Sequence, residues 1–160
     1  MRQLFHFALL LALAAGCSDS TSPRLRSTLL VQPETLTPTT TVAGPVQWLQ
    51  FTIPAAVHNT GNTSLDFAFC DIAIQARTAD DQWRTVWNPT CAVAAESTDA
   101  IQPAQTRQFT VQVAAALSGP GGPVWGAGQV EGTYRLQIGL TDGTSVLTIT
   151  SNDFMLAQSR

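Results

Sequence analysis

The sequence contains no lysine and has little of what nucleic-acid-binding or helical proteins use. After Cys17, seven arginines oppose eleven aspartates and glutamates, and the arginines are scattered singly. Binding to a phosphate backbone needs clustered positive charge, so no basic face for nucleic acid is predicted. Strong helix formers such as Lys and Glu are scarce, whereas aliphatic and β-branched residues are plentiful. This composition favours strands.

Histidine is nearly absent as well, because only His58 lies outside the N-terminal apolar run. Histidine is the commonest general acid or base near neutral pH. His58 lies at a predicted strand end next to the turn-forming Asn59-Thr60-Gly61, which favours a solvated turn residue over a catalytic one. The sequence has no G-x-S-x-G nucleophile elbow and no cluster with zinc-ligand spacing. We therefore expect a non-enzymatic protein with no metal and no other cofactor.

The N-terminus has a short basic head followed by an apolar run from Leu4 to Gly16. A helix of about 13 residues covers roughly 20 Å, which is too short for a hydrocarbon core of about 30 Å and is typical of a secretory signal. The stretch Leu13-Ala14-Ala15-Gly16-Cys17 resembles the lipobox of bacterial lipoproteins, with Ala14 where that pattern usually has Leu. The resemblance implies a signal peptide over residues 1–16, cleavage before Cys17 and a diacylglycerol on the Cys17 sulfur. An ordinary secretory signal that leaves Cys17 as a free thiol is the alternative.

The residues after Cys17 bear on location. In lipoproteins of double-membrane bacteria, Asp directly after the cysteine favours the inner membrane, and here that position is Ser18. The resemblance therefore implies a lipid-anchored protein of the cell envelope, at the outer membrane in preference to the inner. Two or three acyl chains would anchor it firmly. Residues 17–28 are polar and without periodicity, and we interpret them as a flexible tether.

The chain has three cysteines, an odd number for an exported protein. If Cys17 carries lipid, Cys70 and Cys91 remain as one pair. A disulfide between them would close a loop of about 20 residues and add on the order of 3 kcal/mol. The alternatives are two separately buried thiols or a thiol dyad with His58, and a disulfide is the simpler interpretation.

Alternating apolar residues predict about seven or eight short strands. Pro54, inside the longest run, requires a bulge, an unpaired edge position or a break. Thr78–Gln82 and Asp142-Gly143 are predicted turns, Thr35–Pro45 is rich in Thr and Pro, and Ala114–Gly128 is predicted as a long loop. The phase change at Cys70-Asp71, between Leu65–Phe69 and Ile72–Arg77, indicates a bulge or the start of a new strand. Phe154–Leu156 either completes the strand before it or forms a short one of its own. The other predicted strands are Leu29–Val31, Val46–His58, Trp83–Trp87, Phe109–Val113, Tyr134–Leu140 and Val146–Thr150.

This pattern predicts an all-β fold, a single antiparallel β-sandwich over residues 29–160. Gly132-Thr133-Tyr134 resembles the approach to strand F of immunoglobulin-like domains, where a tyrosine hydroxyl bonds to upstream backbone. Leu136 stands where those domains have a cysteine, so their usual disulfide is not implied. The whole pattern resembles the immunoglobulin-like domains of small bacterial lipoproteins. From Leu29 to Leu156 it also bears a vaguer likeness to the intracellular proteinase inhibitor family.

Three tryptophans are the candidate ligand-binding residues. Trp83 and Trp87 are four apart, which on a regular strand places them on one face about 13 Å from each other. Exposed, they would stack on sugar rings; buried, they would fill the core. Trp125 lies within the Gly/Pro-rich stretch 119–128, where it either marks a contact surface or caps the core. Asp80-Asp81 is interpreted as a solvated hairpin tip in preference to a calcium site.

The sequence thus predicts a non-enzymatic, lipid-anchored envelope protein whose immunoglobulin-like domain has a structural or binding role. Its expected partners are the membrane, through the lipid, and an envelope protein or a glycan. One alternative is a glycan- or protein-binding module that uses exposed tryptophans. Another, implied by the family likeness alone, is a proteinase inhibitor.

Overall fold

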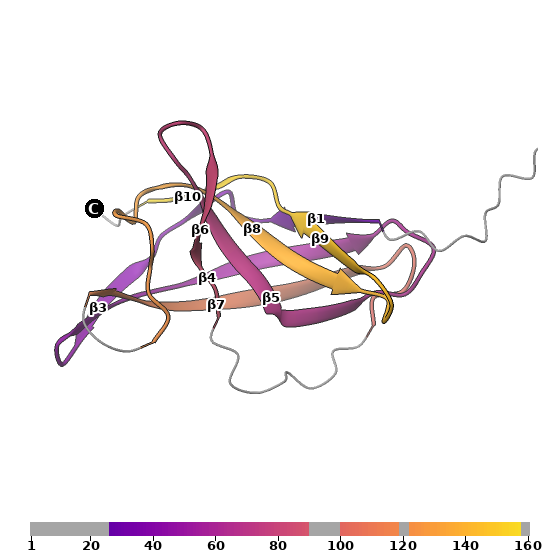
Figure 1. The fold of residues 1–160 in the computed structure, drawn as a ribbon, viewed down its shortest axis with the longest axis horizontal. Helices are drawn as coiled ribbons and strands as arrows, with labels where there is room; N and C mark the ends of the chain where they lie inside the picture. Colours follow the sequence, from indigo (N-terminus) through magenta and orange to yellow (C-terminus); the bar gives the residue numbers. More distant parts are fainter. Residues whose placement is uncertain (1–25, 90–99, 119–121, 158–160) are drawn as a thin grey trace, which may run out of the picture.

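The computed structural model describes residues 26–89, 100–118 and 122–157, and these residues are all-β (Figure 1). The predicted signal peptide, Cys17 and Cys91 lie outside the described residues. Nowhere in the described ranges does an apolar helix reach membrane-spanning length.

The first sheet is built around the long strand β4 (Val46–Asn59). Strand β7 (Thr106–Ser118) runs antiparallel along one edge of β4, from His58 opposite Thr106 to Gln47 opposite Ser118. Strands β1 (Ser27–Val31) and β3 (Thr39–Ala43) share the other edge of β4, β1 near its end and β3 near its start.

The second sheet is built around β8 (Gly132–Thr141). Strand β5 (Asp66–Arg77) pairs along one edge, with β6 (Trp83–Trp87) outside it. Strands β9 (Val146–Thr150) and β10 (Phe154–Leu156) pair with the other edge. The short strand β2 (Thr35–Leu36) adds to β10 in parallel, so this sheet is mixed and the prediction of a wholly antiparallel fold is wrong at this edge.

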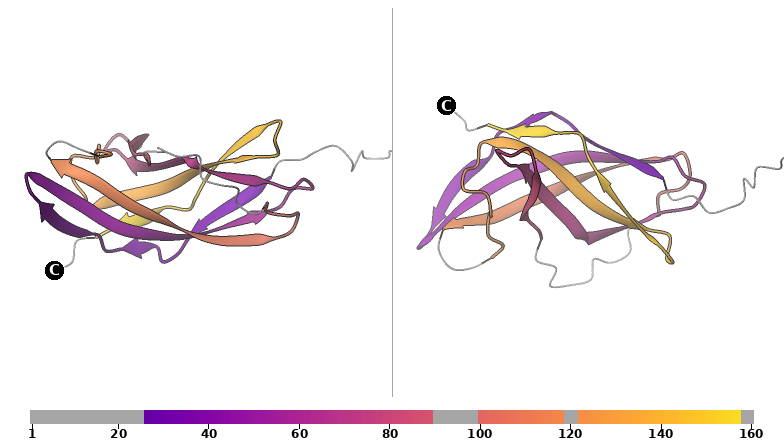
Figure 2. Two further views of the ribbon diagram at one scale, coloured as in Figure 1. Left: turned by 90° about the horizontal axis from the view of Figure 1, so that it is seen from below. Right: turned by 45° about the horizontal axis from the view of Figure 1, so that its top comes forward.

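The two sheets bury one common hydrophobic core, because alternate residues of each strand point inward. In β4 the inward residues run from Leu49 to Val57 at every second position, and in β8 from Tyr134 to Leu140. Figures 1 and 2 show the result as two layers, with β5 and β8 crossing β4 and β7 obliquely. The outward positions of each sheet are therefore the surfaces open to ligands.

Pro54 occupies the unpaired edge position that its missing amide hydrogen requires. The chain leaves the first sheet after Val31, joins the second sheet as β2, and returns as β3 from Thr39. Between these points β4 has no strand on that edge, and Pro54 only accepts a hydrogen bond from Gln32 N (3.2 Å). The proline thus costs no ladder hydrogen bond, and the prediction is confirmed.

Most expected strands are confirmed, with differences at the short or threonine-rich ones. The phase change at Cys70-Asp71 is a bulge within one continuous strand, since the pairing of β5 with β8 shifts between Ala68 and Ile72. The Thr/Pro-rich stretch 35–45 contains β2 and β3, which lack the alternation that reveals longer strands. Strand β7 reaches Ser118, beyond the predicted end at Val113.

Asn59 is the one fully buried polar residue of the described core, and its side chain holds the turn after β4. Its Nδ2 donates to the carbonyl oxygens of Thr63 and Ile101, each at 2.8 Å, and its Oδ1 accepts from Gly61 N at 2.9 Å. Three hydrogen bonds satisfy the buried amide. They also tie the β4–β5 turn to the segment that leads into β7.

Tyr134 bridges β8 to the loop before it. Its hydroxyl donates to Val130 O at 2.8 Å, and the ring is 1% exposed. Burial raises the pKa of Tyr134 to about 12, and the indole of Trp125 beside it opposes the rise. The predicted back-bonding of this tyrosine to upstream backbone is confirmed.

Candidate functional site

The outward residues of β4 and β7 form a broad surface that we call the uncharged face. Opposite residues in the two strands lie side by side on it, such as Thr52 beside Gln112 and Ala56 beside Gln108. Its members are Trp48, Gln50, Thr52, Pro54, Ala56 and His58 of β4 and Thr106, Gln108, Thr110, Gln112 and Ala114 of β7.

This face carries no Asp, Glu, Arg or Lys side chain. The charged residues of the described chain lie on loops, on the second sheet, or, for Arg107, at an inward-facing position of β7. His58 is its one titratable member, and the ring Nδ1 lies 3.0 Å from Thr106 Oγ1 across the strands. The surface is therefore polar through amides, hydroxyls and one imidazole.

Most of the polar groups on this face are available for a ligand. Within the described residues, the side chains of five exposed members make no hydrogen bond to protein: Gln50, Thr52, Gln108, Thr110 and Gln112. A glutamine amide offers donors and acceptors, and a threonine hydroxyl offers both as well. The face thus presents a mixed array of donors and acceptors.

Two shallow concavities lie along the middle of the face. One of about 330 Å³ is lined by Leu30, Pro54, Gln108 and Thr110 among others. The second, of about 480 Å³, lies toward β3 and includes Thr39, Gln50, Thr52 and Gln112. Both open where β1 and β3 leave the edge of β4 unpaired. Both hollows therefore lie where the chain leaves the edge of β4 to form β2 in the other sheet.

Trp48 stands at one end of the face and is partly exposed. A Cβ placed at Gly122 would come within 2.7 Å of the Trp48 ring, so the loop after β7 passes directly against it. The indole is thereby held against the protein while part of it stays in solvent. The sequence-based selection missed Trp48, although its position in the alternation of β4 was a usable signal.

Trp125 is buried, which corrects the hypothesis that it marks an exposed contact surface. Its ring is 4% exposed and packs edge-on against Phe51 of the first sheet and tilted against Tyr134 of the second, with centroids 5.8 and 5.5 Å apart. The loop folds back because its backbone pairs with Ala116 and Val86. Trp125 caps the core, the second of the two expected roles.

Trp83 and Trp87 do not share a face, contrary to the prediction. The pairing of β6 with β5 shifts between Ile74 and Gln75, and this bulge reverses the alternation. Trp87 is consequently 5% exposed, with its indole nitrogen donating to Ala114 O at 3.3 Å. Trp83 stays partly exposed on the outer surface of the second sheet.

The exposed ring of Trp83 is already engaged by the protein. The Arg135 guanidinium lies 4.4 Å from its centroid, a cation–π contact. Arg135 Nε also donates to Gln75 Oε1 at 2.7 Å, and Gln75 Nε2 donates to Gln137 Oε1 at 2.6 Å. This side-chain network spans β5, β6 and β8, so a ligand at Trp83 would have to displace Arg135.

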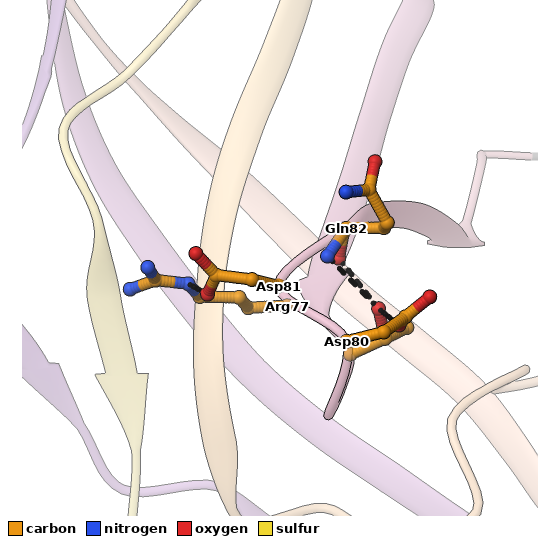
Figure 3. Close-up of polar contacts among 5 residues, drawn as sticks. Arg77, Asp80, Asp81 and Gln82 are labelled. Carbon is orange, nitrogen blue, oxygen red and sulfur yellow. Dashed lines mark hydrogen bonds and ion pairs between the residues drawn. The ribbon is translucent and has the colours of Figure 1, made fainter.

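The hairpin tip between β5 and β6 is a self-contained polar turn (Figure 3). Arg77 Nε donates to Asp81 Oδ1 at 2.5 Å, and Thr78 Oγ1 donates to Asp80 Oδ1 at 2.5 Å and to Gln82 O at 2.8 Å. The hydrogen bond and charge of Arg77 lower the pKa of Asp81. No group of three or more metal-ligating side chains occurs among the described residues. The interpretation of Asp80-Asp81 as a hairpin tip holds.

The remaining candidate residues are dispersed. His58 lies on the first sheet, whereas Cys70 is exposed in β5 of the second, so they form no dyad. Cys70 has an interaction partner, but Cys91 lies outside the described residues. Their disulfide therefore stays a prediction, as does lipidation of Cys17.

Comparison with known proteins gives only distant likenesses. No protein-family model matches the sequence, and no curated protein matches it. A Northeast Structural Genomics Consortium target named SoR45 matches with a TM-score of 0.44 and 13% identity, over 86% of this chain and 88% of that one. A "Putative ApaA Protein" from Bordetella pertussis matches with a TM-score of 0.41 and 14% identity, over 86% and 94% of the two chains.

The sporulation control protein Spo0M from Bacillus subtilis matches with a TM-score of 0.37 and 15% identity. That match covers 84% of this chain and 49% of Spo0M. Likenesses at this level identify neither a family nor a function.

Proposed function

We propose that this protein is a lipid-anchored, non-enzymatic binding domain of the bacterial cell envelope. Cys17 carries the lipid, and the residues between Cys17 and β1 tether the domain to the membrane, at the outer membrane in preference to the inner. The tether predicted over residues 17–28 is shorter than expected, because Ser27 and Thr28 already pair with β4 in strand β1. The uncharged face is the observation that carries the binding role. It is a large, open surface on which most amide and hydroxyl groups make no hydrogen bond to the described protein, Thr106 beside His58 being the exception.

The same proposal includes an immunoglobulin-like strand order. In this assignment β1 and β2 are the two parts of strand A, β4 is B, β5 is C, β6 is C′, β7 is E, β8 is F, and β9 with β10 is G. The pairings β1–β4–β7 and β2–β10–β8–β5–β6 support it. The hydrogen bond from Tyr134 to Val130 O supports the identity of strand F. The proposed Cys70–Cys91 disulfide then joins strand C to the segment after C′.

Anchoring is tested in cells with the Cys17→Ser variant. Lipidation predicts that the wild-type chain sediments with membranes and carries acyl chains by mass spectrometry, whereas Cys17→Ser is exported but soluble. Cys70→Ser is the matched control, because it removes a thiol without touching the proposed lipid site. A wild-type chain with an unmodified Cys17 thiol refutes the anchor.

Envelope binding is tested separately with the soluble Cys17→Ser chain. Added to isolated envelopes, it is expected to co-sediment in a saturable way, because the domain itself recognises an envelope component. Retention of the chain in the supernatant at all concentrations refutes the binding role and leaves a purely structural one.

The alternative binding module that uses exposed tryptophans has one observation in its favour, the partly exposed ring of Trp83. Its pairing with Arg135 makes it the weaker site. Nothing in residues 26–89, 100–118 or 122–157 favours the proteinase-inhibitor alternative, which stays a prediction.

A further inference from the structure

We propose that the uncharged face binds a neutral polysaccharide laid along β4, with Trp48 at one end of the tract. This inference rests on the proposed function and names its ligand class. This site differs from the one predicted from the sequence, because none of Trp83, Trp87 and Trp125 lies on the uncharged face.

The charge pattern argues for a ligand without charge. Polyanions such as nucleic acids or phosphate-rich polymers require Arg or Lys to neutralise them, and this face has neither. Polycations require carboxylates, which are also missing from it. The other surfaces of the protein carry Arg77, Arg84 and Arg135 together with several acidic side chains. The uncharged face has no such side chains, and a surface of this kind matches a neutral partner.

The hydrogen-bonding groups argue for a ligand dense in hydroxyls. A sugar hydroxyl both donates and accepts, and Gln50, Gln108 and Gln112 each offer a donor and an acceptor within a few ångströms of the sheet. Neighbouring Thr52 and Thr110 add hydroxyls between them. Because none of these five side chains has a protein partner among the described residues, binding exchanges water for ligand without breaking the protein's own bonds.

Shape and apolar content distinguish a polysaccharide from a protein or a membrane. Protein interfaces concentrate aromatic and aliphatic side chains at a buried centre, whereas the centre of this face is Thr52, Pro54, Thr110 and Gln112. The two concavities follow one another along β4, and the eight steps from Trp48 to Ala56 cover about 27 Å at the rise of a strand. This is a shallow, elongated tract that suits an extended chain, with the Trp48 indole as a stacking surface at its end.

The test uses the full chain with the Cys17→Ser change and four neutral polysaccharides as probes: insoluble cellulose, insoluble chitin, soluble dextran and soluble amylose. Co-sedimentation and affinity electrophoresis measure retention, with heparin as the charged comparison. We expect retention by at least one neutral probe and none by heparin. Trp48 fluorescence is expected to change on binding, and the change is expected to be lost in Trp48→Phe.

Two double variants locate the site. Thr52→Ala with Gln112→Ala removes two exposed, unpaired side chains from the centre of the face and is expected to weaken binding at least tenfold. The matched control, Thr150→Ala with Gln82→Ala, removes the same residue types from exposed positions of β9 and the β5–β6 turn and is expected to bind like wild type. All four substituted positions are exposed, so folding is retained and circular dichroism checks it.

Four results overturn the inference. The first two are no retention by any of the four neutral probes and retention by heparin alone. The others are equal weakening of binding by both double variants and a dimer in sedimentation that only Thr52→Ala/Gln112→Ala dissociates. The last result would make the face an interface between copies. Each leaves the proposed anchoring and envelope binding to stand or fall on their own assays. Saturable envelope binding that survives Thr52→Ala/Gln112→Ala would place the envelope ligand elsewhere on the domain.

Discussion

The buried hydroxyl of Tyr134 predicts how stability depends on alkaline pH. This is the only tyrosine of the chain, and its O–H donates to Val130 O at 2.8 Å from a residue that is 1% exposed. The perturbation is twofold: raising the pH removes the proton, and Tyr134→Phe removes the hydroxyl.

The sign follows from the two pKa values. The pKa of Tyr134 is raised to about 12 in the folded protein, against about 10 in an unfolded chain. Between these values the unfolded chain releases its proton first, so the free energy of unfolding falls as pH rises. The contribution is fully present below pH ~10 and is lost progressively toward pH ~12. A difference of two in pKa corresponds to a loss of about 3 kcal/mol in the free energy of unfolding.

At neutral pH, Tyr134→Phe is expected to lower the free energy of unfolding by about 1–3 kcal/mol, because the carbonyl of Val130 loses its donor. The variant should also lack the loss of stability between pH ~10 and ~12. The chain is well suited to this test, since it contains no lysine to titrate in the same range.

The assay combines tyrosinate absorbance of the folded protein with denaturant unfolding from neutral to alkaline pH, for wild type and Tyr134→Phe. Tyrosinate that forms with a midpoint near pH ~10 while circular dichroism still shows folded protein would refute the buried hydrogen bond. Parallel pH profiles for the two proteins would show that other groups cause the alkaline loss.

Three further predictions concern packing. Asn59→Ala is expected to cost at least about 2 kcal/mol, because Thr63 O loses its donor and Ile101 O keeps only Leu65 N as a donor. Asn59→Asp should cost more at neutral pH than in acid. Equal denaturation midpoints for wild type and both variants would contradict this prediction. Gly122→Ala should destabilise the protein more than Gly143→Ala. Both glycines have positive φ, but only a Cβ at position 122 would meet the Trp48 ring, at 2.7 Å. Thermal melts that rank the two variants in the opposite order would refute the contact. Trp125→Ala is expected to cost about 3–5 kcal/mol as a core deletion, and a change within a few tenths of a kcal/mol would show the ring is not in the core.

Local patterns predicted the strands well where the pattern is long. The alternation from Phe51 to Val57 and from Tyr134 to Leu140 marks the inward face of β4 and β8 without further information, because a pleated strand half-buried in a core must alternate. Pro54 predicted a bulge, an unpaired edge position or a break, and the structure shows the unpaired edge position. Strands β2 and β3 were missed because β2 has only two residues and β3 is exposed throughout. Neither strand therefore shows the alternation of apolar and polar residues that marks a half-buried strand.

The tryptophans show where local patterns are insufficient. Trp83 and Trp87 were expected on one face because a regular strand repeats every two residues, and a single bulge in the pairing with β5 separated them. Trp125 stands in a Gly/Pro-rich stretch with no periodicity. Its burial depends on backbone hydrogen bonds of this stretch to Ala116 and Val86 and on contacts of its ring with Phe51 and Tyr134. Such contacts join residues distant in sequence.

What the sequence alone determined is the all-β character of the chain, the inward residues of its long strands, the turns at Thr78–Gln82 and Asp142-Gly143, and the demand that Pro54 makes on its edge. These follow from backbone sterics and from the burial of alternate side chains, which act over a few residues. Only the tertiary structure decided that the outward residues of β4 and β7 meet as one uncharged face with Trp48 at its end, and that Trp125 lies inside. The register between β4 and β7, which are distant in sequence, sets those neighbours, and register depends on the packing of the whole core.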